Sequence, residues 1–182
     1  MKTTSSPASH PFPILGVDIG RVIIAGDGPD TSFVGGSEED ALRAPALPGV
    51  FEALERLCRR FRGHVWLVSK CGKRVEGRTR TWLAHHRFFE RTGIDPTHLV
   101  FCRTRPEKTP ICAGLGVTCF VDDRTDVLVP MKGVVPTRVL FGVRTSPEPG
   151  LVAVVDWEAA ERAILAETPF TESAGTEAAR AP

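Results

Sequence analysis

The sequence predicts an α/β fold with a doubly wound, mainly parallel sheet of five strands and helices on both faces. Short apolar segments alternate along the chain with segments whose apolar residues recur at helical spacing. The strand-like segments are apolar on both sides, as expected where helices cover both faces of a parallel sheet. Glycine and proline stand at several of the junctions between them.

Five strands and five helices are predicted. The strand segments are residues 13–18 with 21–24, 64–69, 98–102, 117–123 and 137–142. The helical segments are residues 48–61, 72–93, 106–116, 124–133 and 155–167. The first helix starts at a proline–glycine pair, and glycines are predicted to end the second and the third.

Composition predicts one globular domain at residues 13–166, with a flexible tail at residues 1–12 and another at 167–182. The chain has 182 residues, of which 42% are hydrophobic and 25% charged, an ordinary balance for one domain. Ser, Thr and Pro dominate the first tail, and small, polar and proline residues make up much of the second.

Charge, cysteine content and hydropathy argue against several classes of protein. A formal net charge of +1 gives no overall field that would favour nucleic acid or a membrane surface as partner. The five cysteines include no C-x-x-C pair, which argues against a disulfide framework and a zinc site. The sequence has neither a signal-peptide pattern nor an apolar run of membrane-spanning length, so we expect a cytoplasmic protein.

The candidate functional residues lie at or near the ends of predicted strands. They are Asp18 (first strand), Ser69 and Lys70 (second), Lys108 (after the third), and Asp122 and Asp123 (fourth). The carboxyl ends of parallel strands meet at one edge of the sheet, where such folds bind ligands. Carboxylates can hold a cation such as Mg²⁺ there, while serine and lysine can hold phosphate oxygens. The pattern indicates a phosphoryl-transfer site.

Each of these residues also has a structural interpretation. A single Asp or Ser at a strand end is more often a helix or turn cap, and Lys108 has the surroundings of a solvated loop lysine. The adjacent Asp122 and Asp123 are harder to explain in this way, because two like charges at the end of an apolar strand repel unless a cation joins them. Together, in this order, the residues favour the functional interpretation.

The order of these residues resembles the four motifs of the haloacid dehalogenase-like (HAD) hydrolase superfamily over about residues 14–142. The segments are DIGRV with Asp18, VWLVSK with Ser69, EK with Lys108 and FVDDRTD with Asp122 and Asp123. LPGVFEALERL before VWLVSK is also similar to small nucleotidase-like members.

The resemblance implies a role for each residue. Asp18 is the implied nucleophile, which forms an aspartyl-phosphate. The implied Mg²⁺ site consists of Asp18, the carbonyl of Gly20, Asp122 and Asp123. Ser69 and Lys108 are implied to grip the phosphoryl group, and Lys70 is a further candidate for binding substrate phosphate. A carboxylate attacks a phosphate dianion only if nearby positive charge offsets their repulsion, which agrees with these roles.

One position departs from the usual pattern of phosphatases in this superfamily. These enzymes generally have a second Asp two residues after the nucleophile, as general acid and then base, and here that position is Gly20. Such acid–base help is typically worth ~10²- to 10⁴-fold in rate, so its loss predicts slow turnover, a substitute residue or no hydrolysis. Asp27 and Asp30 are candidate substitutes, although their Gly and Pro neighbours are more typical of turns.

The intervals between the motifs predict a minimal cap or none, so the site is expected to be open to a bulky phosphorylated substrate or to a partner protein. Five basic residues lie beside it, namely Lys70, Lys73, Arg74, Arg78 and Arg80. Most of them are expected on a solvated helix face, but those nearest the helix start could contact substrate phosphate.

The sequence therefore predicts a Mg²⁺-dependent phosphoester hydrolase, either a phosphatase or a nucleotidase-like enzyme. The alternative is a catalytically lapsed HAD-like domain that binds a phosphorylated ligand or a protein partner. A phospho-receiver domain fits poorly, because receivers carry their acidic pair on the first strand. The absence of G-x-x-x-x-G-K-[ST] excludes a P-loop kinase.

Overall fold

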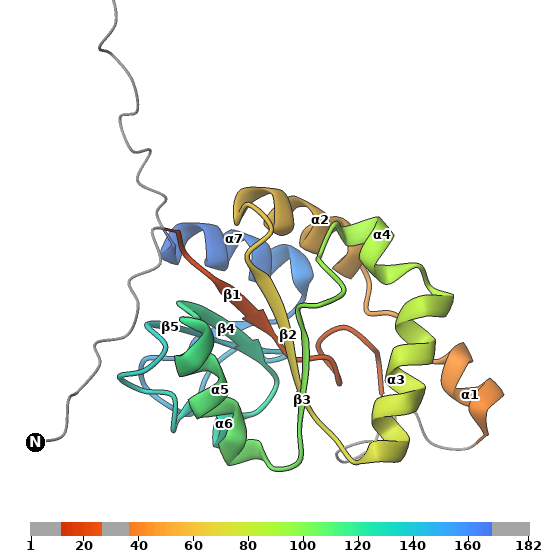
Figure 1. Cartoon of the computed structure of the whole chain (residues 1–182). Helices are drawn as coiled ribbons and strands as arrows, with labels where there is room; N and C mark the ends of the chain where they lie inside the picture. Colours follow the sequence, from red (N-terminus) through yellow and green to blue (C-terminus); the bar gives the residue numbers. More distant parts are fainter. Residues whose placement is uncertain (1–11, 27–36, 169–182) are drawn as a thin grey trace, which may run out of the picture.

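A parallel sheet of six strands forms the centre of the molecule (Figure 1). The computed structural model describes residues 12–26 and 37–168. The strands are β1 (Leu15–Val17), β2 (Val65–Lys70), β3 (Leu99–Cys102), β4 (Cys119–Asp122), β5 (Thr137–Phe141) and β6 (Val152–Val154). They lie in the order β3-β2-β1-β4-β5-β6, and all neighbours are parallel. The predicted doubly wound α/β fold is confirmed, with one strand more than predicted.

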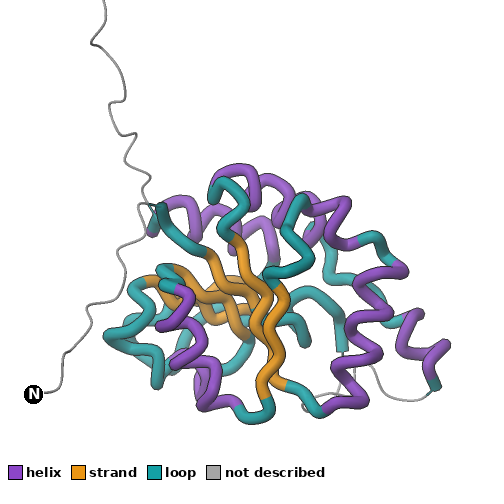
Figure 2. The backbone as a smooth tube through the Cα atoms, viewed as in Figure 1, coloured by secondary structure: helices purple, strands orange, loops and turns teal. Residues whose placement is uncertain are grey.

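Helices cover both faces of this sheet (Figure 2). The helices that pack on one face are α2 (Val50–Arg60), α3 (Lys73–His85), α4 (Phe88–Thr92) and α7 (Trp157–Glu167). Those on the other face are α5 (Lys108–Leu115), which follows the 3₁₀ helix η2 (Arg105–Glu107), and α6 (Thr125–Leu128). The remaining helix, α1 (Glu38–Arg43), lies beside α3 at the edge of the molecule.

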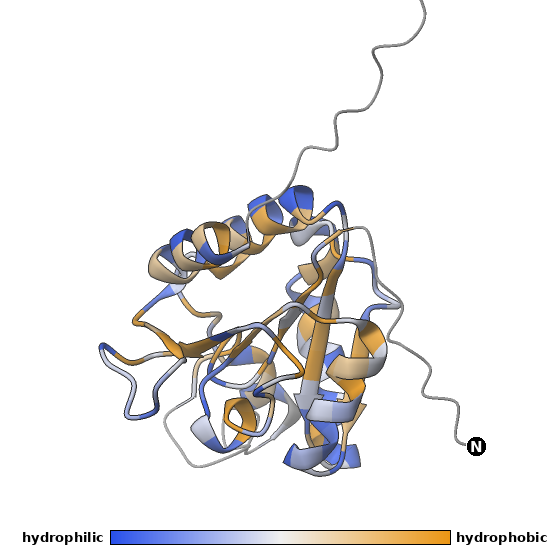
Figure 3. Cartoon of the chain, turned by 90° about the vertical axis from the view of Figure 1, so that its left-hand side faces the viewer, coloured by the Kyte–Doolittle hydropathy of each residue, from blue (hydrophilic) through white to orange (hydrophobic). Residues whose placement is uncertain are grey.

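Alternation along the strands builds a core on each face. Leu15 and Val17 of β1 belong to the larger core, under α2, α4 and α7, whereas Phe120 of β4 belongs to the smaller one, under α5 and α6. Figure 3 shows the resulting apolar interior along the strands. Gly16 faces Phe120, and a Cβ at Gly16 would lie 2.4 Å from its ring, so this close approach requires glycine.

Two predicted elements differ in the structure. Residues 21–24 do not continue the first strand: Ile19 O accepts hydrogen bonds from the amides of Ile23 (2.9 Å) and Ile24 (3.1 Å), which close a tight turn. The predicted helix at 72–93 is two helices, because Arg87 lies in the left-handed region at φ 51°. Phe88, the first residue of α4, is fully buried, so core packing fixes the change of direction.

The turn after β1 is fastened to the C-terminal helix. Trp157, at the start of α7, donates its indole N–H to the carbonyl oxygen of Val22 at 2.6 Å. The carboxylate of Asp156 caps α7 by accepting from Ala159 N at 2.8 Å. The residues that follow Asp18 are therefore held by the far end of the chain.

The predicted tails lie almost wholly outside the described residues, as do Asp27 and Asp30. Between β1 and α2 the described part of the chain forms one short helix, α1. Within the described ranges, no helix is both long and apolar enough to cross a membrane.

Candidate active site

The sheet brings the predicted strand-end residues to one edge. β1 pairs with β2 on one side and with β4 on the other. Asp18 follows the last residue of β1, Ser69 lies near the end of β2, and Asp122 ends β4. The strand order reverses between β1 and β4, which is where open α/β sheets bind ligands.

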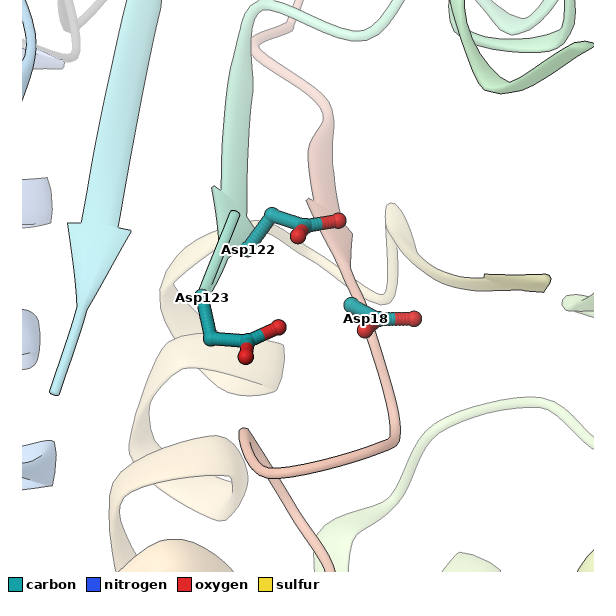
Figure 4. Close-up of side chains that lie close together, drawn as sticks. All are labelled: Asp18, Asp122 and Asp123. Carbon is teal, nitrogen blue, oxygen red and sulfur yellow. The ribbon is translucent and has the colours of Figure 1, made fainter. Parts of the chain in front are cut away.

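Three carboxylates form a cluster at this edge (Figure 4). Asp18, Asp122 and Asp123 each place an oxygen within 4.8 Å of the other two. Asp122 and Asp123 extend from β4 towards the end of β1, where Asp18 lies. Asp122 is fully buried and Asp18 is 7% exposed, so little solvent screens their repulsion.

Lys108 partly neutralises this cluster from the first residue of α5. Its Nζ lies 2.7 Å from Asp122 Oδ2 and 2.8 Å from Asp18 Oδ1, and the side chain is almost wholly buried. Burial by itself disfavours the ammonium, but the charges of Asp18 and Asp122 outweigh it and raise the pKa of Lys108. The lysine is therefore a fixed positive charge between two strand ends.

The pKa values of both strand-four acids lie above the usual range for aspartate. Burial is the main cause for Asp122, with repulsion from Asp18 adding to it and Lys108 opposing it. Burial also raises the pKa of Asp123, together with the charge of Asp18, while Arg21 opposes the shift. A further positive charge nearby would therefore stabilise the ionised form of both acids.

Arg21 supplies positive charge from the other side. Its Nε donates to Asp123 Oδ2 at 2.6 Å, and its Nη2 donates to the same oxygen. Arg21 holds a left-handed backbone at φ 58°, and its amide donates to Ile24 O at 2.8 Å within the tight turn. The turn that begins at Gly20 thus directs an arginine onto the acidic pair.

The cluster fits a divalent metal ion. Asp18 Oδ1, which is buried, has no hydrogen-bond donor in favourable geometry among the described residues, although Lys108 Nζ lies 2.8 Å away. Lys108 is shared between Asp18 and Asp122, so one ammonium faces a cluster of three carboxylates, and a metal ion could offset the remaining negative charge. Carboxylate and carbonyl oxygens are the ligands that Mg²⁺ prefers, and Gly20 lines the same pocket.

One pocket contains most of the predicted site residues. Its lining residues are Asp18, Gly20, Arg21, Ser69, Lys70, Arg105, Lys108, Asp123, Arg124 and Val127. Asp122 lies beneath the pocket, where it accepts from Lys108 Nζ and, at 3.0 Å, from the amide of Arg124. The residues implied as nucleophile, metal ligands and phosphate ligands are therefore all in the pocket wall or directly below it.

Three arginines of this pocket were not predicted as site residues. Arg21 follows Gly20 directly, Arg124 follows Asp123, and Arg105 precedes Lys108 by one helical turn. Their positions in the sequence could have indicated this, because a residue close in sequence to a strand-end ligand lies at the same edge of the sheet. The pocket is consequently much more basic than the net charge of +1 suggests.

Comparison with known proteins finds similarity in structure but not in sequence. The sequence matches no protein-family profile and no curated protein. It is similar in structure to D,D-heptose 1,7-bisphosphate phosphatase from Burkholderia thailandensis, with a TM-score of 0.56 and 14% identity over 84% of this chain and 98% of that one. It is also similar to a haloacid dehalogenase-like family hydrolase from Xanthomonas campestris, with a TM-score of 0.57 and 13% identity over 86% and 96% of the two chains. The chain therefore has the fold of the haloacid dehalogenase-like hydrolases.

Proposed function

We propose that this protein is a metal-dependent phosphoester hydrolase that acts through Asp18. The observation that carries the proposal is the position of Asp18 beside a buried lysine and two further carboxylates. A nucleophilic carboxylate needs positive charge close by, and Lys108 supplies it here. The Burkholderia protein of similar fold is a phosphatase, which agrees with the proposal.

The chain's own residues suffice for most of the chemistry. Asp18 attacks the phosphorus atom, the ester oxygen leaves, and an aspartyl-phosphate remains for water to hydrolyse. Lys108 and Ser69 hold the phosphoryl oxygens, and Lys70 stands at the pocket wall for the same purpose. Asp18, Asp122, Asp123 and the Gly20 carbonyl would hold Mg²⁺, which supplies charge neutralisation for the transferring group.

Assay of purified protein with Mg²⁺ tests this function. The substrates are an aryl phosphate, nucleoside monophosphates and sugar phosphates; the nucleotides are included because LPGVFEALERL before VWLVSK resembles a motif of nucleotidase-like members. We expect hydrolysis that Asp18→Asn abolishes and that EDTA suppresses. Asp126→Asn is the matched control, because Asp126 lies three residues beyond Asp123 and pairs with Arg124 outside the carboxylate cluster. Equal activity in Asp18→Asn would contradict the proposal.

A second candidate function has an observation in its favour. Gly20 replaces the usual acid, and the neighbouring Arg21 binds Asp123. Both features suit a domain that binds a phosphorylated ligand without turning it over. Binding of a phosphorylated ligand by calorimetry, with no product and no phosphoryl group on Asp18 by mass spectrometry, would favour this alternative.

We further propose that the protein works in a reducing compartment such as the cytoplasm. All five cysteines, at positions 58, 71, 102, 112 and 119, are buried free thiols. Disulfides are rare where the cell keeps thiols reduced. Localisation of a tagged chain by microscopy or fractionation tests this.

A further inference from the structure

A second cavity lies between α1 and α3, beside the active-site end of β2. It has a volume of about 500 Å³. Its lining residues are Ala41, Leu42, Lys73, Arg74, Gly77, Arg78 and Thr81. Three of these are basic and none is acidic, so the cavity has a positive wall opposite a partly apolar one.

The cations nearest the start of α3 are available to a ligand. Lys73 and Arg74 are exposed and form no hydrogen bond or ion pair with any other described residue. The acid of the same helix turn, Glu76, is bound by Arg80 at 3.0 Å and by Arg103 at 2.7 Å. Glu76 is thereby engaged by arginines that do not line the cavity, and within residues 12–26 and 37–168 no acid forms an ion pair with Lys73 or Arg74.

Gly77 keeps the wall of this cavity open. It lies in the middle of α3, where glycine is less favourable than alanine. A Cβ at this position would meet no atom within 4 Å, and the residue does not have a positive φ. Neither packing nor backbone conformation therefore requires glycine, whereas any side chain there would enter the cavity.

The active-site pocket and the second cavity are lined by residues that are close together in the sequence. Lys70 ends β2 and lines the active-site pocket, and Lys73 begins α3 and lines the second cavity. The first-turn amides of α3, a helix of 13 residues, add the positive end of its dipole to the basic side chains. A single ligand could thus contact both pockets across residues 70–73.

We infer that the cavity between α1 and α3 is a second phosphate site, which binds the far phosphate of an extended small-molecule bisphosphate. The reacting phosphate of the same molecule lies at Asp18, so the inference rests on the proposed function. The organic part of the ligand crosses residues 70–73, and Leu42 and Ala41 offer it an apolar wall.

Calorimetry with linear alkanediol bisphosphates of increasing length, each against its monophosphate, tests this inference. The protein is the full chain with Mg²⁺ and the substitution Asp18→Asn, which prevents turnover. We expect the best bisphosphate to bind ~tenfold more tightly than its monophosphate, as charge-assisted contacts to a second phosphate allow. Lys73→Ala with Arg74→Ala should remove this advantage and leave monophosphate affinity within about twofold.

Two further variants distinguish a specific phosphate site in the cavity from a general electrostatic attraction to the basic helix. Gly77→Leu fills the cavity without loss of helix propensity and should also remove the advantage. Arg80→Ala removes a cation of the same helix that does not line the cavity. This variant should keep the full affinity advantage of the bisphosphate over the monophosphate. A bisphosphate advantage that survives Lys73→Ala/Arg74→Ala, or that Arg80→Ala reduces equally, would overturn the inference. So would tighter binding of a 5′-phosphorylated oligonucleotide than of every bisphosphate.

The results distinguish this inference from the proposed function. If the chain with Asp18 intact hydrolyses monophosphates but shows no bisphosphate advantage, the function stands and the second site is wrong. If it hydrolyses nothing but the advantage depends on Lys73 and Arg74, the second site stands and the hydrolase assignment is wrong.

Discussion

Arg21 donates from two guanidinium nitrogens to a single oxygen of Asp123. Asp123 is one of the three carboxylates that could hold a metal ion, and its side chain is 9% exposed. The arginine therefore supplies positive charge at the place where a metal ion would also supply it. A metal ion bound here would compete with the arginine for this oxygen.

Replacement of Arg21 by alanine should strengthen metal binding. We expect the Kd for Mg²⁺, measured by calorimetry, to fall about fivefold, because a partly exposed ion pair is worth about 1 kcal/mol. Arg124→Ala is the matched control, since Arg124 lines the same pocket but directs its guanidinium to Asp126. Weaker Mg²⁺ binding in Arg21→Ala would show instead that the arginine orients Asp123 for the metal.

Replacement of Lys108 by methionine should destabilise the metal-free protein. The change leaves Asp18 and Asp122 buried beside each other without their shared cation, at a cost of about 3–5 kcal/mol in the free energy of unfolding. Urea titration in EDTA measures this cost, and Mg²⁺ should recover part of it. Lys132→Met, at an exposed lysine, is the control. An unchanged urea midpoint for Lys108→Met would contradict this role.

The convergence of Asp18, Ser69 and Asp122 could be predicted from the sequence, because the ends of neighbouring parallel strands share one edge whatever the loops do. The position of Lys108 between two carboxylates could not, because it depends on how η2 and α5 turn the chain after β3. The contact of Arg21 with Asp123 depends on the left-handed backbone of Arg21. The local sequence does not indicate this conformation, because the residue is not a glycine.

The missed elements have similar causes. β6 has three residues, too few for a periodic pattern, and is defined by its pairing of Val152 with Val139. The break at Arg87 has neither glycine nor proline to mark it, and follows from burial of Phe88 in the core. Tertiary contacts decide both, whereas the remaining strands were predictable from their apolar runs.

Alkaline pH should destabilise the protein through its buried thiols. Burial raises the pKa of Cys71 to about 11 and that of Cys112 to about 12, and it also raises the pKa of the other three cysteines. Unfolded thiols lose their protons near pH 9, whereas folded ones keep them, so the unfolded state binds fewer protons above that pH.

The free energy of unfolding should therefore fall by about 1.4 kcal/mol per pH unit for each such thiol between pH 9 and its folded pKa. Urea titrations on either side of pH 9 measure this fall. Cys112→Ala should reduce the slope, since it removes one of these thiols. A thiol reagent should also label the native protein much more slowly than the unfolded chain. Rapid labelling of the native protein would contradict the burial on which the prediction depends.

Gly20 determines which esters the proposed enzyme can cleave. No carboxylic acid stands two residues after Asp18 to protonate the leaving oxygen, so aryl phosphates, whose leaving groups depart as stable anions, should react faster than alkyl phosphates. Hydrolysis of the aspartyl-phosphate also lacks its base, so a burst of product should precede slow turnover.

Gly20 does not have a positive φ and lines the pocket, so an aspartate there meets no backbone strain. Gly20→Asp should raise steady-state turnover of alkyl phosphates by ~10²-fold, with Gly20→Asn as the isosteric control that cannot transfer a proton. Equal rates of the original chain on alkyl and aryl esters, together with no gain in Gly20→Asp, would show that another residue serves as the acid.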